Sequence, residues 1–450
     1  MKNFFKKAFL ALCIISIASC SDDDDTIFIP DSMTIADFVA DNADYSSLLA
    51  ALQRTGLDVA LNGTGTFTVF APNNAAFTEF LDGASLEDVP VATLEQVLRN
   101  HVLGTTETAA DLTTGYVKNI ATEANSGANI SMYINTTSGV VINGESTVTT
   151  PDIMTDNGVI HAVDKVISLP TMLTFVGLDS NFSTLATVAT TTTGFNTDFA
   201  AVLSGEDSDL TLLAPDNDAF TDLGDISGFS TADLEQVLLN HVIAGTNVST
   251  ALTTTYSNTL ATYGDTMNNI SIYINTDSGV SFNGISDVSE ADIVASNGVI
   301  HKVDAVITLP TVVTFATADA NFSTLVAALT TLTPSTDFAS ILSTALGTDP
   351  APFTVFAPTD DAFAAITVPT DENEVAAILN YHVVGGANVR STDLVDGPVT
   401  TLNGDVTIDA SAPSVTGAGN TSASNIIVVD VQAANGVIHA IDQVLLPAAN

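Results

Sequence analysis

The stretch Asn157-Gly-Val-Ile-His161 returns as Asn297-Gly-Val-Ile-His301 and Asn435-Gly-Val-Ile-His439, and an aspartate stands three residues after each histidine (Asp164, Asp304, Asp442). Two other motifs precede each copy in constant order. They are Val69-Phe-Ala-Pro72, Leu212-Leu-Ala-Pro215 and Val355-Phe-Ala-Pro358, then Asn100-His101, Asn240-His241 and Tyr381-His382. The repeat of about 140 residues far exceeds the roughly 20 to 50 residues of a solenoid unit. The sequence therefore predicts three tandem domains, at residues 33–169, 170–310 and 311–450, each long enough to bury its own core.

The first half of each repeat has the pattern of helices around one strand. A segment with apolar residues at helical spacing opens the copy, and the strand that follows, Thr66–Ala71 in copy one, is expected to stop at Pro72. The polar residues after the proline could suggest a calcium loop in copy two, at Asp216-Asn-Asp218. Copy one has Asn73-Asn74 there, and no EF-hand glycine or distal glutamate follows, so we expect helix caps instead.

The first histidine of each repeat lies on the apolar face of a predicted helix. In copy one Leu94, Leu98, His101 and Val102 share that face, and Gly104 is expected to end the helix. We therefore expect the ring to be buried and hydrogen-bonded to the backbone. The second half of each repeat is predicted to be β, because Asn-Gly pairs between β-branched runs favour hairpins. These pairs are Asn143-Gly144, Asn157-Gly158, Asn283-Gly284, Asn297-Gly298, Asn403-Gly404 and Asn435-Gly436.

Residues 1–20 have the features of a lipoprotein signal peptide: early lysines, a short apolar segment, and Ile17-Ala-Ser-Cys20. This ending resembles the bacterial lipobox, which predicts a lipid on Cys20; a plain secretory signal is the alternative. The acidic tether at residues 21–32 begins with Ser21-Asp-Asp-Asp-Asp25, which is similar to the export signals of surface lipoproteins in Bacteroidetes. We therefore expect a lipid-anchored protein on the outer face of the outer membrane. No later stretch reaches the length of a membrane helix.

The composition excludes several classes of partner and site. The chain has 9 basic and 52 acidic residues, a formal net charge of −43. Such a surface repels phosphate backbones and anionic headgroups, so nucleic acid is not an expected partner and the membrane contact is expected to be the lipid alone. The two cysteines are Cys13, inside the predicted signal peptide, and Cys20. No disulfide or cysteine-based site is therefore expected in the mature protein.

On these motifs the chain resembles the fasciclin domain family, over residues 33–447 in three copies. The Ala-Pro segment followed by Ala-Phe, the helix end with histidine, and the Asn-Gly-Val-Ile-His strand with its aspartate occur in the family's order each time. The resemblance implies an α+β fold in which each domain is a β-rich wedge of two sheets with helices packed at one edge. It also implies an adhesion module like those of periostin-like proteins, with no catalytic motif.

The resemblance further implies candidate adhesion residues. In periostin-like members an Asp-Ile pair ahead of the last motif is implicated in cell binding. Here Asp152-Ile153 matches well and Asp292-Ile293 less fully, whereas Ser424-Asn-Ile-Ile-Val428 has asparagine where the aspartate is expected. The family's Tyr-His pair is complete only at Tyr381-His382. The alternative for Asp152 and Ile153 is a turn residue followed by a core residue, which we weigh equally.

The six histidines (His101, His161, His241, His301, His382, His439) lie in the two motifs, but the pattern favours structural roles. His161 and Asp164 are three residues apart on a strand, so their side chains leave opposite faces and cannot form a dyad. No nucleophile recurs beside either histidine, and two histidines without further ligands do not make a zinc site. We expect Asp164, Asp304 and Asp442 to bond nearby backbone. No catalytic residue, metal or cofactor is predicted.

The sequence thus favours a non-enzymatic adhesion or matrix-contact lipoprotein that binds protein or polysaccharide through weak repeated sites, with self-association possible. The alternative is a surface lipoprotein that captures polysaccharide for an uptake system. The absence of Trp and the presence of only seven Tyr disfavour it, because sugars are usually bound by stacking on such rings. A hydrolase would need a cluster of groups with perturbed pKa in a cleft, and the sequence marks none.

Overall fold

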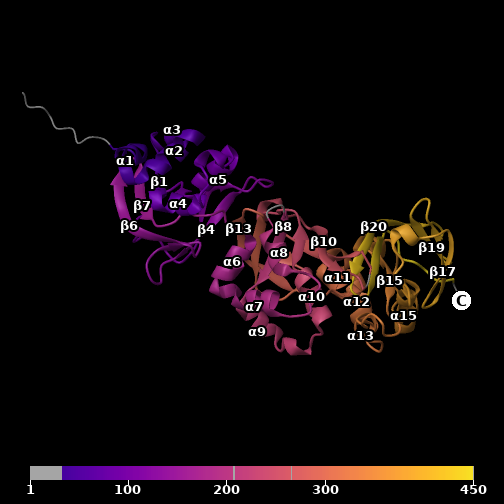
Figure 1. The fold of residues 1–450 in the computed structure, drawn as a ribbon. Helices are drawn as coiled ribbons and strands as arrows, with labels where there is room; N and C mark the ends of the chain where they lie inside the picture. The colour runs from indigo at the N-terminus through magenta and orange to yellow at the C-terminus, as the bar shows by residue number, and fades with distance from the viewer. Residues whose placement is uncertain (1–32, 206–207, 265, 449–450) are drawn as a thin grey trace, which may run out of the picture.

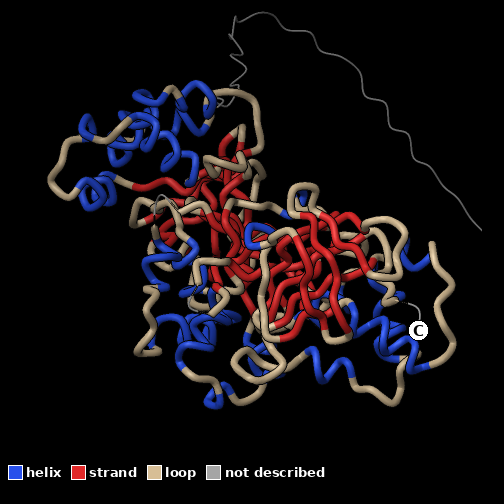
Figure 2. The backbone as a smooth tube through the Cα atoms, turned by 90° about the vertical axis from the view of Figure 1, so that its right-hand side faces the viewer, coloured by secondary structure: helices blue, strands red, loops and turns tan. Residues whose placement is uncertain are grey.

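The computed structural model describes residues 33–205, 208–264 and 266–448, so the predicted signal peptide, Cys20 and the acidic tether lie outside the described residues. Figure 1 shows three domains that follow one another from the N-terminal to the C-terminal end. In each domain the strands lie together and the helices lie to one side of them (Figure 2). The predicted α+β fold in three repeated domains is confirmed.

The elements recur in the same order in each domain. Domain one contains α1 (Ile35–Asp41), η1 (Ala43–Tyr45), α2 (Ser46–Thr55), α3 (Leu57–Leu61), β1 (Phe67–Pro72), α4 (Asn74–Leu81), η2 (Leu86–Asp88), α5 (Val91–Asn100), β2 (Val102–Leu103), β3 (Gly115–Thr122), β4 (Asn129–Asn135), β5 (Val141–Ile142), β6 (Ser146–Thr155) and β7 (Gly158–Val163). Domain two contains α6 (Met172–Leu178), η3 (Ser180–Phe182), α7 (Ser183–Thr191), α8 (Phe199–Ser204), β8 (Leu210–Pro215), α9 (Asn217–Leu223), η4 (Ile226–Gly228), α10 (Thr231–Leu239), β9 (Val242–Ala244), η5 (Ser249–Ala251), β10 (Thr255–Thr262), β11 (Asn269–Asn275), β12 (Ser281–Phe282), β13 (Ser286–Ala295) and β14 (Gly298–Val303).

Domain three has a smaller second sheet. Its elements are α11 (Val312–Ala318), η6 (Ala320–Phe322), α12 (Ser323–Thr330), α13 (Phe338–Leu342), β15 (Phe353–Pro358), α14 (Asp360–Ala364), α15 (Glu372–Tyr381), β16 (Val383–Gly385), η7 (Ser391–Asp393), β17 (Gly397–Thr401), β18 (Gly404–Asp409), β19 (Ser414–Gly417), β20 (Ser424–Ala433) and β21 (Gly436–Ile441). The seven strands close into a ring in domains one and two, whereas in domain three the order runs from β16 to β17 without closing.

Two sheets joined at their edges make the ring of domain one. The start of β6 pairs with β5 and the rest of it pairs with β7, so β6 belongs to both sheets. The first and last strands, β1 and β7, are parallel, with Phe67 opposite Gly158. The turn between β5 and β6 uses Asn143 and Gly144 with φ of 46° and 67°, the two positive values that a type I′ hairpin requires.

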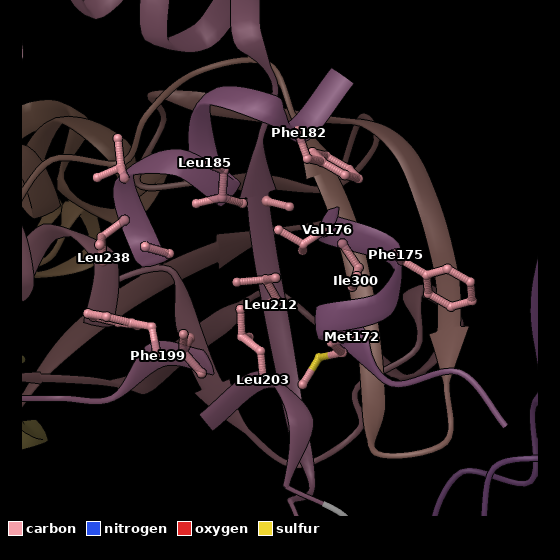
Figure 3. Close-up of a cluster of buried hydrophobic side chains, with 14 of the residues drawn as sticks. Met172, Phe175, Val176, Phe182, Leu185, Phe199, Leu203, Leu212, Leu238 and Ile300 are labelled. Carbon is pink, nitrogen blue, oxygen red and sulfur yellow. The ribbon is translucent and has the colours of Figure 1, made fainter. Parts of the chain in front are cut away.

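Each domain has two apolar cores on the two sides of its central strands. In domain one Val69, Ala71 and Ile160 pack under the helices, whereas Phe70 and Val163 pack inside the ring. Both faces of β7 are therefore buried, which is why its sequence shows no alternation of polar and apolar residues. Figure 3 shows the helix-side core of domain two, where Met172, Phe175, Phe182, Leu212 and Ile300 converge.

Local predictions were confirmed at the helix starts but wrong at one helix end. Asn73, Asp216 and Thr359 each accept the N–H of the residue three positions on, so these residues are caps. The predicted extension of the helix through Val102 to Gly104 is wrong. The carbonyl of His101 accepts the N–H of Phe70 at 2.9 Å, and Val102 pairs with Val69, because the sheet takes these backbone groups before another helical turn can form. Pro72, expected to follow the strand, ends it.

Successive domains pack through one repeated contact. Tyr116 of β3 donates its hydroxyl to Asp179 of domain two at 3.1 Å, and its ring packs edge-on against Phe175. Tyr256 makes the same contacts with Asp319 and Phe315 of domain three. A serine hydroxyl on the adjacent strand accepts a backbone N–H from the next domain's long strand at both joints: Ser131 from Val294 and Ser271 from Gln432, each at 3.0 Å. Tyr133 and Tyr273 enter the helix-side core of the following domain.

Within the described residues no single helix is long and apolar enough to cross a bilayer. One pair, Val312–Ala318 with Ala320–Thr330, reaches the required length and composition only with a bend of 99° between its halves.

Candidate functional site

The Asp-Ile positions lie at a bulge in the long strand before the last motif. In β6 the pairing with β7 shifts between Thr150 and Ile153, so Asp152 stands outside the ladder. Its φ is 60°, in the left-handed region that aspartate tolerates better than most residues. The equivalent shift in β13 places Asp292 outside the ladder with φ of 62°. A bulge that turns a polar residue out of a sheet is a common device at binding surfaces.

The second histidine of each repeat holds this bulge. The N–H of Asp152 donates to Nδ1 of His161 at 3.2 Å, and Nε2 of the same ring lies 2.9 Å from the carbonyl of Glu107. A carbonyl can only accept, so Nε2 donates to Glu107 while Nδ1 accepts the N–H of Asp152. His301 and His439 repeat both contacts, and burial lowers the pKa of each of these two rings.

The carboxylate of the bulge aspartate binds a neighbouring loop. Asp152 accepts the N–H of Ala109 at 2.8 Å. Asp292 accepts both the N–H and the hydroxyl of Ser249, at 2.7 and 2.6 Å. These hydrogen bonds tie the bulge to the loop that leads into the second sheet. The aspartate therefore has a structural role in both copies, whatever else it binds.

The third copy also has this aspartate, and the expectation of Asn425-Ile426 in its place is wrong. Asp430 has φ of 59°, donates its N–H to Nδ1 of His439, and accepts the N–H and hydroxyl of Ser391. Asn425 corresponds instead to Thr147 and Asp287, since all three donate their N–H to the aspartate after the last strand. The signal that could have found Asp430 is its distance from the histidine: Asp152, Asp292 and Asp430 each precede one by nine residues.

The three copies differ in how much of the bulge faces solvent. The Asp152 side chain is 43 % exposed, Ile153 is half-buried and Met154 is 62 % exposed. In copy two, Ile293 is 1 % exposed because it lies in the helix-side core of its own domain, whereas Val294 is 0 % exposed because it packs against Ala121 and Ile130 of domain one. The carbonyl of Asp292 also accepts Lys118 of domain one at 2.5 Å, and burial lowers the pKa of this lysine to about 8. In copy three Asp430 pairs with Arg390 at 3.5 Å and its side chain is 17 % exposed.

The Tyr-His pair predicted for adhesion is buried. Tyr381 is 2 % exposed; its hydroxyl donates to the carbonyl of Asp405 at 2.5 Å and accepts the N–H of Ala418 at 3.0 Å. His382 is also 2 % exposed and bonds the backbone of Ile378 and Leu445. Neither side chain can contact a partner in this conformation. The tyrosine instead fills the space next to the reduced second sheet of domain three, where the other copies have Asn100 and Asn240.

The helix-end histidines connect the helix to the last segment of each domain. Nδ1 of His101 lies 2.7 Å from the carbonyl of Val97, and Nε2 accepts the N–H of Ile167 at 2.8 Å. The ring is therefore neutral with its proton on Nδ1, and burial lowers its pKa to about 4. His241 and His382 repeat this geometry and this pKa.

The aspartates after the last strand complete the motif. Asp164 accepts the N–H of Thr147 at 2.6 Å, Asp304 that of Asp287 at 2.8 Å, and Asp442 that of Asn425 at 2.7 Å. Residues 33–205, 208–264 and 266–448 contain no group of three His, Cys, Asp or Glu that could hold a metal ion.

Comparisons with known proteins agree with this geometry. The sequence profile of the fasciclin domain matches residues 43–170, 180–310 and 320–447. The chain is 29 % identical over 430 residues to pig (Sus scrofa) transforming growth factor-beta-induced protein ig-h3, which covers 90 % of the chain and 56 % of that protein. It is 28 % identical to human (Homo sapiens) periostin, over 92 % of the chain and 47 % of periostin. The chain therefore spans about half the length of these relatives.

A solved pair of domains from the insect cell adhesion molecule fasciclin I aligns with 59 % of this chain and 97 % of its own, at 16 % identity and a TM-score of 0.39. The three profile matches together cover most of the chain. The chain belongs to the fasciclin domain family, with three fasciclin domains in tandem.

Proposed function

We propose that this protein is a non-enzymatic adhesion or matrix-contact protein of the cell surface, which binds a protein or polysaccharide partner through the bulge of domain one. The observation that carries the proposal is the exposure of Asp152 and Met154 in the first copy, where none of the described domains covers them. The corresponding residues of copies two and three lie in the joints. Membership of the fasciclin family supports an adhesive role, although the partners of the longer relatives are not transferred with it.

The alternative, capture of polysaccharide for an uptake system, is weaker on the described surface. All seven tyrosines are buried or half-buried, and the chain has no Trp. The large hydrophobic residues that are exposed within the described residues are all Met, Val, Ile or Leu, so this surface offers no aromatic platform for a sugar ring.

The double substitution Met154→Ser and Asp152→Asn is expected to weaken binding to the adhesive partner at least tenfold. The first change removes an exposed apolar contact, and the second removes an exposed negative charge. The measurement is saturation binding of residues 26–450 to a panel of the producer's cells, matrix proteins and polysaccharides. Asp222→Asn, on the exposed side of α9, is the charge-matched control. Saturable binding that survives the double substitution would move the site elsewhere. Binding to polysaccharides alone would favour capture.

We further propose that a lipid on Cys20 anchors the chain to the outer membrane with the domains outside the cell. Cys20→Ser is expected to move the protein from the membrane to the soluble fraction, since the acyl chains provide the only proposed anchor. Fractionation with immunoblotting measures this, and Cys13→Ser is the matched control that should stay with the membrane. Retention of the Cys20→Ser variant in the membrane fraction would contradict the assignment.

A further inference from the structure

Strand β20 of domain three presents an apolar edge that is unlike the rest of the surface. It pairs with β19 only at Ser424 and Asn425, so beyond these two residues it has no strand partner on that side among the described residues. Ile427, Val428 and Val429 follow, exposed by 53 %, 39 % and 44 %. They are the only three consecutive large hydrophobic residues that are exposed in the described part of the chain. An open edge with β-branched side chains favours the addition of another strand.

The other two copies protect the same positions. The pairing with the last strand aligns Ile427, Val428 and Val429 with Thr149-Thr150-Pro151 in copy one and with Ser289-Glu290-Ala291 in copy two. Thr149 and Ser289 direct their hydroxyls to a carbonyl of the neighbouring strand. Glu290 forms an ion pair with Lys302, and proline cannot donate to a ladder. The third copy has replaced all of these features with apolar side chains.

Grooves flank this edge at the joint of domains two and three, where β20 lies next to β10 in Figure 1. One has a volume of about 280 Å³ and the other of about 350 Å³, and Tyr256, Val428 and Val431 line both. The two grooves are therefore neighbours along the apolar edge. The N–H of Gln432 is already bound by Ser271, which holds β20 in place beside domain two.

One end of this groove is acidic. Asp319, Asp360 and Asp361 line this end, whereas at the other end Asp430 is paired with Arg390, the only cation in either lining. Burial acts to raise the pKa of the Asp360 carboxyl, but hydrogen bonds from Ser323 and Thr324 outweigh it and hold the pKa below the ordinary value. A ligand that fits must therefore be apolar in the middle and cationic at the end that meets Asp360 and Asp361. A second copy of this chain does not fit, because its own edge carries the same acidic groups and a formal net charge of −43.

We propose that the β20 edge binds an extended peptide segment of another protein, one in which β-branched residues alternate with Lys or Arg. The segment adds a strand beside Ile427–Val429, its apolar side chains enter the grooves, and its cations approach Asp360 and Asp361. This inference rests on the proposed adhesive function and gives it a partner class. It names a surface far from Asp152, so the two proposals are tested separately.

The test is fluorescence anisotropy with a labelled decapeptide of alternating Val and Lys, added to residues 26–450 at about 0.15 M salt, where screening leaves only close charge pairs. The decisive variant is Ile427→Thr with Val428→Thr and Val429→Pro, which installs the residues of copy one and changes no charge. We expect it to bind at least tenfold more weakly. The control variant is Val59→Thr, which makes the same substitution as Val428→Thr at an exposed position of α3. It is expected to bind the peptide as tightly as the unmodified protein does.

A control peptide, a single-substitution variant and sedimentation separate the possible outcomes. The peptide with Glu in place of Lys is expected not to bind, and equal binding of both would overturn the charge argument. Val428→Thr alone keeps the edge open and should weaken binding less than the triple change, which guards against misfolding of the proline variant.

Equal peptide affinity for the triple variant and the unmodified protein would overturn the site. Sedimentation that shows a dimer lost in the triple variant would assign the edge to a second copy. If the adhesion panel still responds to Asp152 and Met154 while the peptide does not bind, the adhesive function stands and this inference fails.

Discussion

Gly158→Ala is expected to unfold domain one, with a loss of roughly 4 kcal/mol or more, a large part of the stability of an ordinary domain. A Cβ at this position would lie 2.0 Å from the carbonyl oxygen of Phe67 and 2.8 Å from its carbonyl carbon. These are backbone atoms of the parallel partner strand β1, so no side-chain rotation can relieve the overlap. The parallel pair of β1 and β7 separates the two cores of the domain, and both lose their packing if it opens.

Gly139→Ala is the matched control for this substitution. Gly139 also has a positive φ, of 100°, but a Cβ there would meet nothing within 4 Å. Its cost should be limited to backbone strain of roughly 1 to 2 kcal/mol. Urea unfolding followed by circular dichroism, with hydrogen exchange to identify the domain that opens, compares the two. Similar losses in both variants would show that the overlap with β1 is not the main cause of the instability at Gly158.

Stability is expected to fall as the pH drops from 6.5 to 4, by about 3 kcal/mol in each domain. Burial lowers the pKa of His101, His241 and His382 to about 4 from the ordinary value of 6.5 that each has in the unfolded chain. Between these values the unfolded state binds a proton that the folded state does not. The contribution is therefore complete above pH 6.5 and is lost as the pH falls through the folded pKa.

Urea unfolding at pH 7.5, 5.5 and 4.5 measures this loss, and NMR titration of the imidazole protons gives the folded pKa directly. His101→Asn should be less stable at pH 7.5 because the N–H of Ile167 loses its acceptor, yet the stability of domain one should depend less on pH in this variant than in the unmodified protein. The pKa values of Asp37 and Asp111, which hydrogen bonds to Thr34 and Thr108 lower, lie below this window. Ring titration near pH 6.5 in the folded protein would contradict the burial argument.

Features determined by neighbouring residues could be predicted from the sequence. The caps at Asn73, Asp216 and Thr359 and the Asn143-Gly144 turn depend on conformational preferences of a few adjacent residues, and repetition in three copies reinforced each of them. The family also followed from short motifs in constant order. The end of the helix at His101 could not be predicted, because it depends on a hydrogen bond from the N–H of Phe70, on strand β1, to the carbonyl of His101.

The candidate site shows the same limit. Asp152 and Asp292 were identified by their neighbours in sequence, but Asp430 was missed because Val431 follows it instead of isoleucine. The hydrogen bond to the histidine nine residues later defines the position, and a backbone contact does not require a particular side chain after it. The burial of Tyr381 was likewise not expected, because it depends on the reduced second sheet of domain three.

The sequence by itself determined that this protein has three fasciclin domains, with structural histidines and polar helix caps, because local backbone chemistry and apolar periodicity specify these features within each repeat. Only the tertiary structure decided which copies can meet a partner. Val294 packs against domain one, whose Ser131, 163 residues earlier, accepts its N–H, whereas Met154 is 62 % exposed because none of the described domains packs on it. The exposed edge at Ile427–Val429 likewise depends on where β19 stops pairing. Accessibility is a property of contacts between distant segments, so identical motifs in one chain acquire different environments.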